Sequence, residues 1–160
     1  MALALNATLV ARGPGGEREI AAADFFVDYL TTAMAPAEVL VAVRVPKREG
    51  WGTHYEKFNR VAQAWALVGV AAAVRRDDGV IAEARIALTN MGPTPVRAHA
   101  VEQALTGGPA TVEAVAAAAG QALEGTRPAA DVFASAEYRT HLAAVLTRRA
   151  VVAAGGIRAA

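Results

Sequence analysis

Short apolar runs separated by turn residues fill the first ninety positions of the chain, and they predict β-strands. The runs at about 65–75 and 80–90 flank the pair Asp78-Gly79. Asp-Gly between two apolar runs is the strongest short-range hairpin signal, so we expect these runs to pair as antiparallel strands. The alternating segment at about 53–60 predicts a third strand of the same sheet.

Beyond Pro95 the pattern changes to helical spacing. We expect helices over about 96–106, 109–123 with Thr111 as N-cap, and 136–153. In the last of these, apolar residues recur near the helical period at Leu142, Val145, Leu146 and Val151. Strands followed by helices predict an α+β fold, in which a small antiparallel sheet of three main strands packs against a three-helix bundle.

Residues 1–46 predict an N-terminal hairpin or arm. A strand over 7–11 leads to a glycine turn at 13–16, after which an extended run resumes. Asp24 is placed to cap a short helical turn, and 39–45 reads as a further strand. A hairpin alone is marginally stable in water, so we expect this arm to pack on the following residues or on a partner.

Composition and charge exclude several classes of function. The chain has 16 Lys and Arg against 15 Asp and Glu, which is far from the clustered basic surplus of a nucleic-acid-binding protein. It has no cysteine, which excludes disulfides, iron–sulfur ligation and a thiol nucleophile in this chain. Its three histidines are widely separated, so no metal site is predicted. No uncharged apolar run reaches the about 18 residues of a membrane span, and the start lacks the basic region of a secretory signal. We therefore expect a cytoplasmic protein.

Two side chains stand out as candidates for ligand binding. Lys57 lies in a predicted strand beside a glycine-bearing loop, where its cation could pair with a phosphate or an electron-rich ring. Trp65 could stack on a planar ligand. A solvated strand lysine and a core tryptophan are the commoner roles of these residue types. The run Gly13 to Gly16 joins two strands rather than opening a helix, so it predicts a turn and not a phosphate loop. The residues alone identify no catalytic group.

Several motifs occur together in a recognisable order. They are Val45-Pro46, Tyr55-Glu56-Lys57-Phe58, Trp65-Ala66, Gly92-Pro93-Thr94-Pro95 and Glu137-Tyr138-Arg139. In this order they resemble the C-terminal half of the FAD-binding medium subunit of carbon monoxide dehydrogenase and xanthine-dehydrogenase-like molybdenum hydroxylases. The resemblance divides the chain into a remnant of an FAD-binding domain over 1–46 and a carbon monoxide dehydrogenase flavoprotein C-terminal-like domain over 47–160.

The resemblance implies an oxidoreductase function. In that family FAD passes electrons between an iron–sulfur subunit and an external acceptor, and the C-terminal domain closes over the isoalloxazine ring. Three positions match family positions near the ring, namely Leu40, Lys57 and Trp65. A lysine cation there would favour the anionic reduced flavin. The implied partners are the molybdenum and iron–sulfur subunits of a hydroxylase complex, and the unpartnered N-terminal arm makes a homodimer an alternative.

The chain also departs from the family pattern. The glycine-rich phosphate-binding loops of the FAD domain would lie before residue 1, so we expect FAD binding by the isolated chain to be weak or absent. The family usually has an acidic residue and an arginine where Ala64 and Val61 stand. Three functions therefore stay open: a medium-subunit piece that closes over FAD, a stand-alone small-molecule-binding protein or enzyme that lost FAD, and a structural assembly domain.

Overall fold

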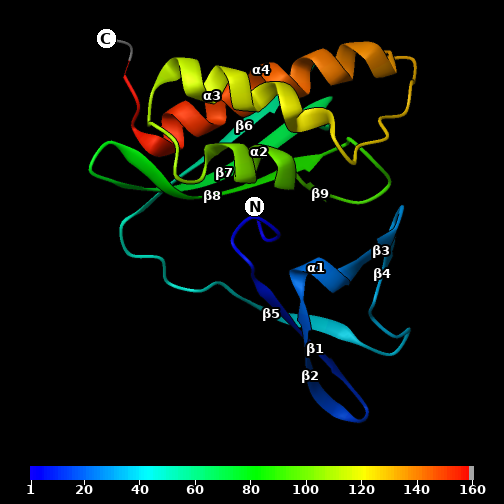
Figure 1. The fold of residues 1–160 in the computed structure, drawn as a ribbon. Helices are drawn as coiled ribbons and strands as arrows, with labels where there is room; N and C mark the ends of the chain where they lie inside the picture. Colours follow the sequence, from blue (N-terminus) through cyan, green and yellow to red (C-terminus); the bar gives the residue numbers. More distant parts are fainter. Residues whose placement is uncertain (159–160) are drawn as a thin grey trace.

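In the computed structural model, which describes residues 1–158, the chain forms two lobes joined by an extended segment (Figure 1). The N-terminal lobe contains a three-stranded sheet in the order β2-β1-β5 and a small hairpin of β3 and β4. Its elements are β1 (Thr8–Gly13), β2 (Gly16–Ala21), α1 (Ala22–Phe25), β3 (Phe26–Asp28), β4 (Thr31–Thr32) and β5 (Val39–Arg44).

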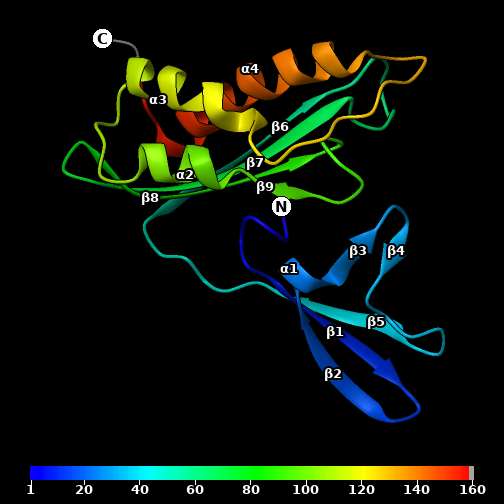
Figure 2. The ribbon, with the colours of Figure 1, turned by 45° about the vertical axis from the view of Figure 1, so that its right-hand side comes forward.

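The C-terminal lobe is a four-stranded antiparallel sheet with its helices on one face (Figure 2). The strands, which lie in chain order, are β6 (Trp51–Phe58), β7 (Val68–Asp77), β8 (Val80–Thr89) and β9 (Val96–Arg97). The helices are α2 (His99–Leu105), α3 (Val112–Ala119), which continues as a 3-10 turn over Gly120–Leu123, and α4 (Ala136–Gly155). This arrangement confirms the predicted α+β class, with three main strands and three helices.

The hairpin between β7 and β8 forms at the predicted position. Asp77 pairs with Val80, and the two residues between them adopt left-handed backbone conformations, with φ of 42° at Asp78 and 79° at Gly79. Asn and Asp followed by Gly tolerate these conformations, which match the twist of the flanking strands. The turn chemistry therefore sets the register of the two longest strands.

The core lies between the sheet and the helices. Because side chains alternate along a strand, every second residue of β7 faces the helices. These residues are buried with apolar side chains of α4, in a cluster that includes Val68, Val70, Ala72, Val74, Leu142, Leu146 and Val151. The other face, called the open face here, is only partly covered: Tyr55 and Lys57 are exposed on it, whereas Ala71 and Ala73 are buried.

That N-terminal turn lies between the two lobes (Figure 1). Leu3 and Ala4 are buried in a small cluster with Ala71 of β7 and Ala87 of β8. Arg48, in the segment that joins the lobes, donates a hydrogen bond to the Leu5 carbonyl at 3.2 Å. Alanines at these strand positions let the turn approach the open face of the sheet closely.

The strand predicted over 65–75 begins at Val68, so Trp65 is not part of it. Gln63 has a left-handed φ of 65°, and the Ala64 amide donates to the Val61 carbonyl at 3.2 Å. The Leu67 amide then donates to the Phe58 carbonyl at 2.8 Å and closes the loop. The prediction was wrong here because a local turn interrupts an apolar run of uniform composition.

The helix predicted over 96–106 begins at His99 instead, because Val96 and Arg97 form a fourth strand. They pair with Leu88 and Ala87 at the edge of the sheet, where unpaired backbone groups are available. The helix predicted over 109–123 is α-helical only to Ala119. Its predicted N-cap is confirmed, since the Thr111 hydroxyl accepts a hydrogen bond from the Ala114 amide at 3.2 Å.

The N-terminal arm confirms the predicted hairpin and corrects one detail. β1 and β2 pair from Thr8↔Ala21 to Gly13↔Gly16. The N-cap of α1 is Ala21, which has no capping side chain, and Asp24 lies within the helix rather than before it. The main chain enters the helix directly from the paired strand, so the capping prediction was wrong. Among residues 1–158, no helix combines the length and apolar character that a bilayer crossing requires.

Candidate functional site

Lys57 projects from the open face of the C-terminal sheet. A Cβ on Gly52 would meet the main chain of α4, so the even-numbered residues of β6 face that helix. By alternation Lys57 and Tyr55 face the opposite side, where both are exposed. The Tyr55 hydroxyl lies over Gly69 of the neighbouring strand, only 2.5 Å from where a Cβ would be. The lysine cation is therefore carried on a regular strand and is accessible to a ligand.

Trp65 lies on the loop that joins β6 to β7 and is 81% exposed. Two side chains hold the end of this loop. Asn90 donates to the Ala66 carbonyl at 3.0 Å, and Arg139 of α4 donates to the Leu67 carbonyl at 2.5 Å. The tryptophan ring thus extends from a loop whose main chain is anchored, and it contributes nothing to the buried core.

Arg139 is the most unusual of these anchors because it is a charged residue that is only 2% exposed. Its second terminal nitrogen donates to the Asp131 carboxylate at 2.6 Å. The Asp131 carboxylate also accepts from the Phe133 and Ala134 amides, and these amides together with Arg139 hold the pKa of Asp131 below its usual value. A hydrogen-bonded path therefore links the loop 124–135, helix α4 and the loop that carries Trp65.

Leu40 lies on β5 of the other lobe and is 40% exposed. β5 is the edge strand of its sheet, and all six of its residues are exposed. The apolar residues beside Leu40 are Val39, Val41, Val43 and Val45, which are 43% to 65% exposed. These four valines are called the β5 apolar edge.

The three predicted site residues are thus all accessible, but the chain alone does not join them into one cavity. No hydrogen bond, ion pair or cation–π contact connects Leu40, Lys57 and Trp65 within residues 1–158. A cavity of about 560 Å³ is lined by residues of β8, β9 and α2, and one of about 310 Å³ lies beside the glycine turn. Neither is lined by these three residues.

An ion pair forms part of the lining of the smaller cavity. Arg18 donates to the Glu38 carboxylate at 2.6 and 2.8 Å, and together with the Ala35 amide it lowers the pKa of Glu38 to about 2. Arg18 thus already pairs with a carboxylate, and Gly13 to Gly16 form the predicted turn between β1 and β2. Among residues 1–158, no three His, Asp or Glu side chains gather as a metal site.

Comparison with known proteins accounts for both lobes. Residues 53–154 match the family described as CO dehydrogenase flavoprotein C-terminal domain. The chain belongs to this flavoprotein family. Residues 1–48 match the family described as FAD binding domain in molybdopterin dehydrogenase, so the N-terminal lobe is related to an FAD-binding domain. The resemblance stated from the sequence motifs is confirmed.

Several relatives of this flavoprotein are named as medium chains or medium subunits. The chain is 37% identical to the carbon monoxide dehydrogenase medium chain of Hydrogenophaga pseudoflava, over 96% of this chain and 54% of that protein. It is 33% identical to the nicotine 6-hydroxylase medium subunit of Paenarthrobacter nicotinovorans, over 96% of this chain and 54% of that protein. The chain therefore spans about half the length of these relatives.

Solved structures show the same fold. A carbon monoxide dehydrogenase from Hydrogenophaga pseudoflava matches with a TM-score of 0.91 and 40% identity, over 97% of this chain and 54% of that chain. Quinoline 2-oxidoreductase from Pseudomonas putida 86 matches with a TM-score of 0.90 and 29% identity, over 97% of this chain and 54% of that chain. Both lobes are therefore arranged in this flavoprotein as in those enzymes.

Replacing Trp65 with alanine is expected to leave the stability of the protein nearly unchanged. A side chain that is 81% exposed has little packing to lose, so the free energy of unfolding should change by no more than about 0.5 kcal/mol. Urea denaturation followed by circular dichroism measures this difference. A loss of several kcal/mol would mean that the ring is buried in solution and is unavailable to a ligand.

Proposed function

We propose that this chain is part of the flavoprotein medium subunit of a molybdenum hydroxylase and that it closes over the isoalloxazine ring of FAD. In this proposal residues 1–46 belong to the FAD-binding domain and 47–160 form the domain that covers the ring. The observation that carries the proposal is the accessibility of Lys57 and Trp65. Lys57 places a cation on β6, and Trp65 places a flat ring on the loop that follows this strand. Neither side chain has a structural role in the fold, and both match family positions near the ring.

The residues present fit one end of the cofactor. FAD, when bound, supplies the electron transfer. Lys57 would place a positive charge beside the ring, Trp65 would shield one side of it from water, and Leu40 would border it from the other lobe. Dinucleotide sites usually grip the pyrophosphate with backbone N–H groups at a glycine loop or helix N-terminus. The glycine turn of this chain joins two strands and its neighbouring arginine is paired, so it is not such a loop.

The β5 apolar edge supports a further part of the proposal. An edge strand with unpaired backbone groups and a row of exposed valines usually pairs with another segment. Because the relatives are about twice as long as this chain, we infer that the remaining half of a medium subunit covers this edge. It can be supplied by the same polypeptide or by another one. The molybdenum and iron–sulfur subunits would then be the partners of the completed subunit, and a homodimer is the alternative that covers the same edge.

Titration with FAD tests the cofactor part of the proposal. One partly exposed ring contact contributes about 0.5–2 kcal/mol, whereas association first costs at least about 4 kcal/mol. Micromolar binding needs about 8 kcal/mol net, so the isolated chain should not reach half-saturation below about a micromolar. Flavin fluorescence measures this binding. A yellow protein after purification would contradict weak binding and would assign the whole site to this chain.

A complementation experiment tests the function itself. The chain is co-expressed with the part of the Hydrogenophaga pseudoflava medium chain that it does not match, and bound flavin is measured after purification of the complex. We expect FAD to be retained, and Lys57→Ala or Trp65→Ala to change the flavin absorption spectrum. Lys47→Ala is the matched control, since Lys47 is an exposed lysine of the joining segment. A complex that holds flavin with unchanged spectra in both variants would remove Lys57 and Trp65 from the site, and a complex without flavin would favour a structural assembly role.

A further inference from the structure

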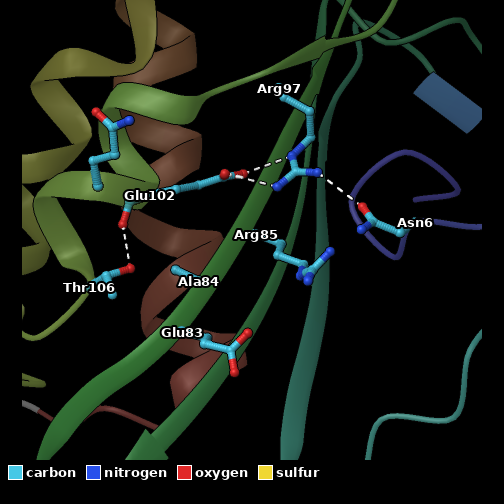
Figure 3. A pocket seen from close by; sticks show the side chains of 8 residues that line it. Asn6, Glu83, Ala84, Arg85, Arg97, Glu102 and Thr106 are labelled. Atoms are coloured by element: carbon cyan, nitrogen blue, oxygen red, sulfur yellow. Dashed lines mark hydrogen bonds and ion pairs between the residues drawn. The ribbon is translucent and has the colours of Figure 1, made fainter. Parts of the chain in front are cut away.

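Arg85 is in register with Ala73 and Thr53, so it faces the same side of the C-terminal sheet as Lys57. It lines the larger cavity, and the lining of this cavity is rich in charge. Its volume is about 560 Å³. Figure 3 shows that its charged side chains come from β8, β9 and α2, with Asn6 of the N-terminal turn beside them. The charged residues in the lining are Glu83, Arg85, Arg97 and Glu102. Some of these charges are already neutralised by ion pairs inside the protein.

Both carboxylates of the cavity pair with arginines other than Arg85. Glu102 is only 8% exposed and accepts two hydrogen bonds from Arg97, each at 2.8 Å. It also accepts from the Ile86 amide at 2.7 Å. Glu83 accepts from Arg75 of the neighbouring strand at 2.8 Å. Each carboxylate therefore has an arginine of its own, and the Nδ1 atom of His99 also lies 3.2 Å from the Glu102 carboxylate.

Of the two arginines in the described lining, Arg85 is the one without an ion pair. No carboxylate lies within 4.0 Å of its guanidinium among residues 1–158, and its only aromatic contact is with Trp51, whose ring centroid is 5.6 Å away. Arg48 approaches the same ring, at 5.0 Å from its centroid. The Nε of Arg48 is buried and has no hydrogen-bond partner. Two arginines without counter-ions thus converge on one indole ring.

The electrostatics of the cluster agree with this geometry. Burial lowers the pKa of the Arg85 guanidinium, and the cations of Arg48 and Arg97 lower it further, against smaller opposing effects of Glu83 and Glu102. Arg48, Arg75, Arg85 and Arg97 carry four positive charges, against two on the carboxylates. The surplus of two is what an anion with two negative charges would neutralise.

We propose that this cavity binds a phosphate group, free or as a monoester, with Arg85 as its principal ligand. A phosphate monoester carries about −1.5 to −2 charges at pH 7, which matches the surplus better than a single carboxylate does. The guanidinium fork of Arg85 suits two phosphate oxygens. The exposed amide of Gln103, also in the lining, is a second donor, while Arg48 and Arg97 contribute charge. This inference is independent of the flavin proposal, because it uses neither Lys57 nor Trp65 as a ligand.

Trp51 provides a direct readout. The chain has two tryptophans, so in a Trp65→Phe background Trp51 is the only one. Inorganic phosphate is titrated at constant ionic strength with chloride as the reference anion, and Trp51 fluorescence is followed. We expect a saturable change with half-saturation at about a millimolar or below. A second titration with adenosine monophosphate, and with adenosine alone, separates a free phosphate site from a monoester site. The same response to chloride, or no saturation, would overturn the proposal.

Two variants test the assignment without disturbing the core. Arg85→Gln should raise the dissociation constant for phosphate about tenfold or more, since a charge-assisted bidentate contact is lost. Gln103→Glu places a carboxylate in the cavity and should abolish phosphate binding by repulsion. Because Gln103 is exposed, this substitution should not disturb folding. Arg12→Gln is the control, because Arg12 is an exposed arginine of β1 that pairs with Glu17. Affinities within about twofold of the parent in both test variants would refute the site.

Discussion

Replacing Arg139 with alanine is expected to lower the free energy of unfolding by about 3 kcal/mol or more. The side chain is 2% exposed and donates to the Leu67 carbonyl and the Asp131 carboxylate at 2.5 and 2.6 Å. Its removal deletes two charge-assisted hydrogen bonds and leaves a cavity between α4 and the loop that carries Trp65. Urea denaturation measures the loss.

The matched control is Arg148→Ala, in the same helix. Arg148 is exposed, so its replacement should change the unfolding free energy by less than about 0.5 kcal/mol. Trp65 fluorescence in a Trp51→Phe background gives a second measurement. A loosened loop should change the emission of its tryptophan in Arg139→Ala and not in Arg148→Ala. Equal stabilities of the two variants would show that the buried guanidinium does not anchor the loop.

Replacing Gly52 with alanine is expected to destabilise the protein by about 3 kcal/mol, at the upper end of the usual cost of overpacking. A Cβ at this position would lie 1.9 Å from the Ala154 carbonyl oxygen of α4. The obstacle is main chain, which cannot rotate away as a side chain can. Strand β6 and the end of α4 must therefore separate, and the melting temperature should fall accordingly.

Gly120→Ala is the control for this substitution. Gly120 has a right-handed helical conformation, and a Cβ there would meet nothing within 4 Å. Its replacement should leave stability unchanged or raise it by up to about 1 kcal/mol, because alanine restricts the unfolded chain. If Gly52→Ala is as stable as Gly120→Ala, the close approach of β6 and α4 is not maintained in solution.

The sequence allowed the hairpins and the order of elements to be predicted because these depend on local chemistry. Asp78-Gly79 specifies its turn without help from distant residues, and the Thr111 hydroxyl caps the helix it precedes. The errors arose where a distant segment decides the outcome. Val96 and Arg97 have no strong strand pattern of their own and become a strand only because the edge of β8 is available to them.

The two candidate sites also differ in how far they could be predicted from the sequence. Lys57 and Trp65 were singled out by their residue types and by the family resemblance, and both are exposed in the fold. The arginine cluster was missed because Arg48, Arg85 and Arg97 come from three separate segments. They come together only in the fold, where Arg48 and Arg85 both approach the Trp51 ring and Arg97 lies near enough to Arg85 to lower its pKa. No spacing rule connects such positions. Three arginines far apart in the sequence are ordinarily surface residues.

The buried N-terminal turn determines where this protein can be modified for experiments. Leu3 and Ala4 are packed against the sheet, and burial lowers the pKa of the Met1 amino group. Met1 is 41% exposed, so a purification tag or fluorescent label on this amino group would start close to Leu3, Ala4 and the cavity lined by Asn6 and Arg97 and could disturb them. Labels for binding studies are better placed on the exposed faces of α3 or α4.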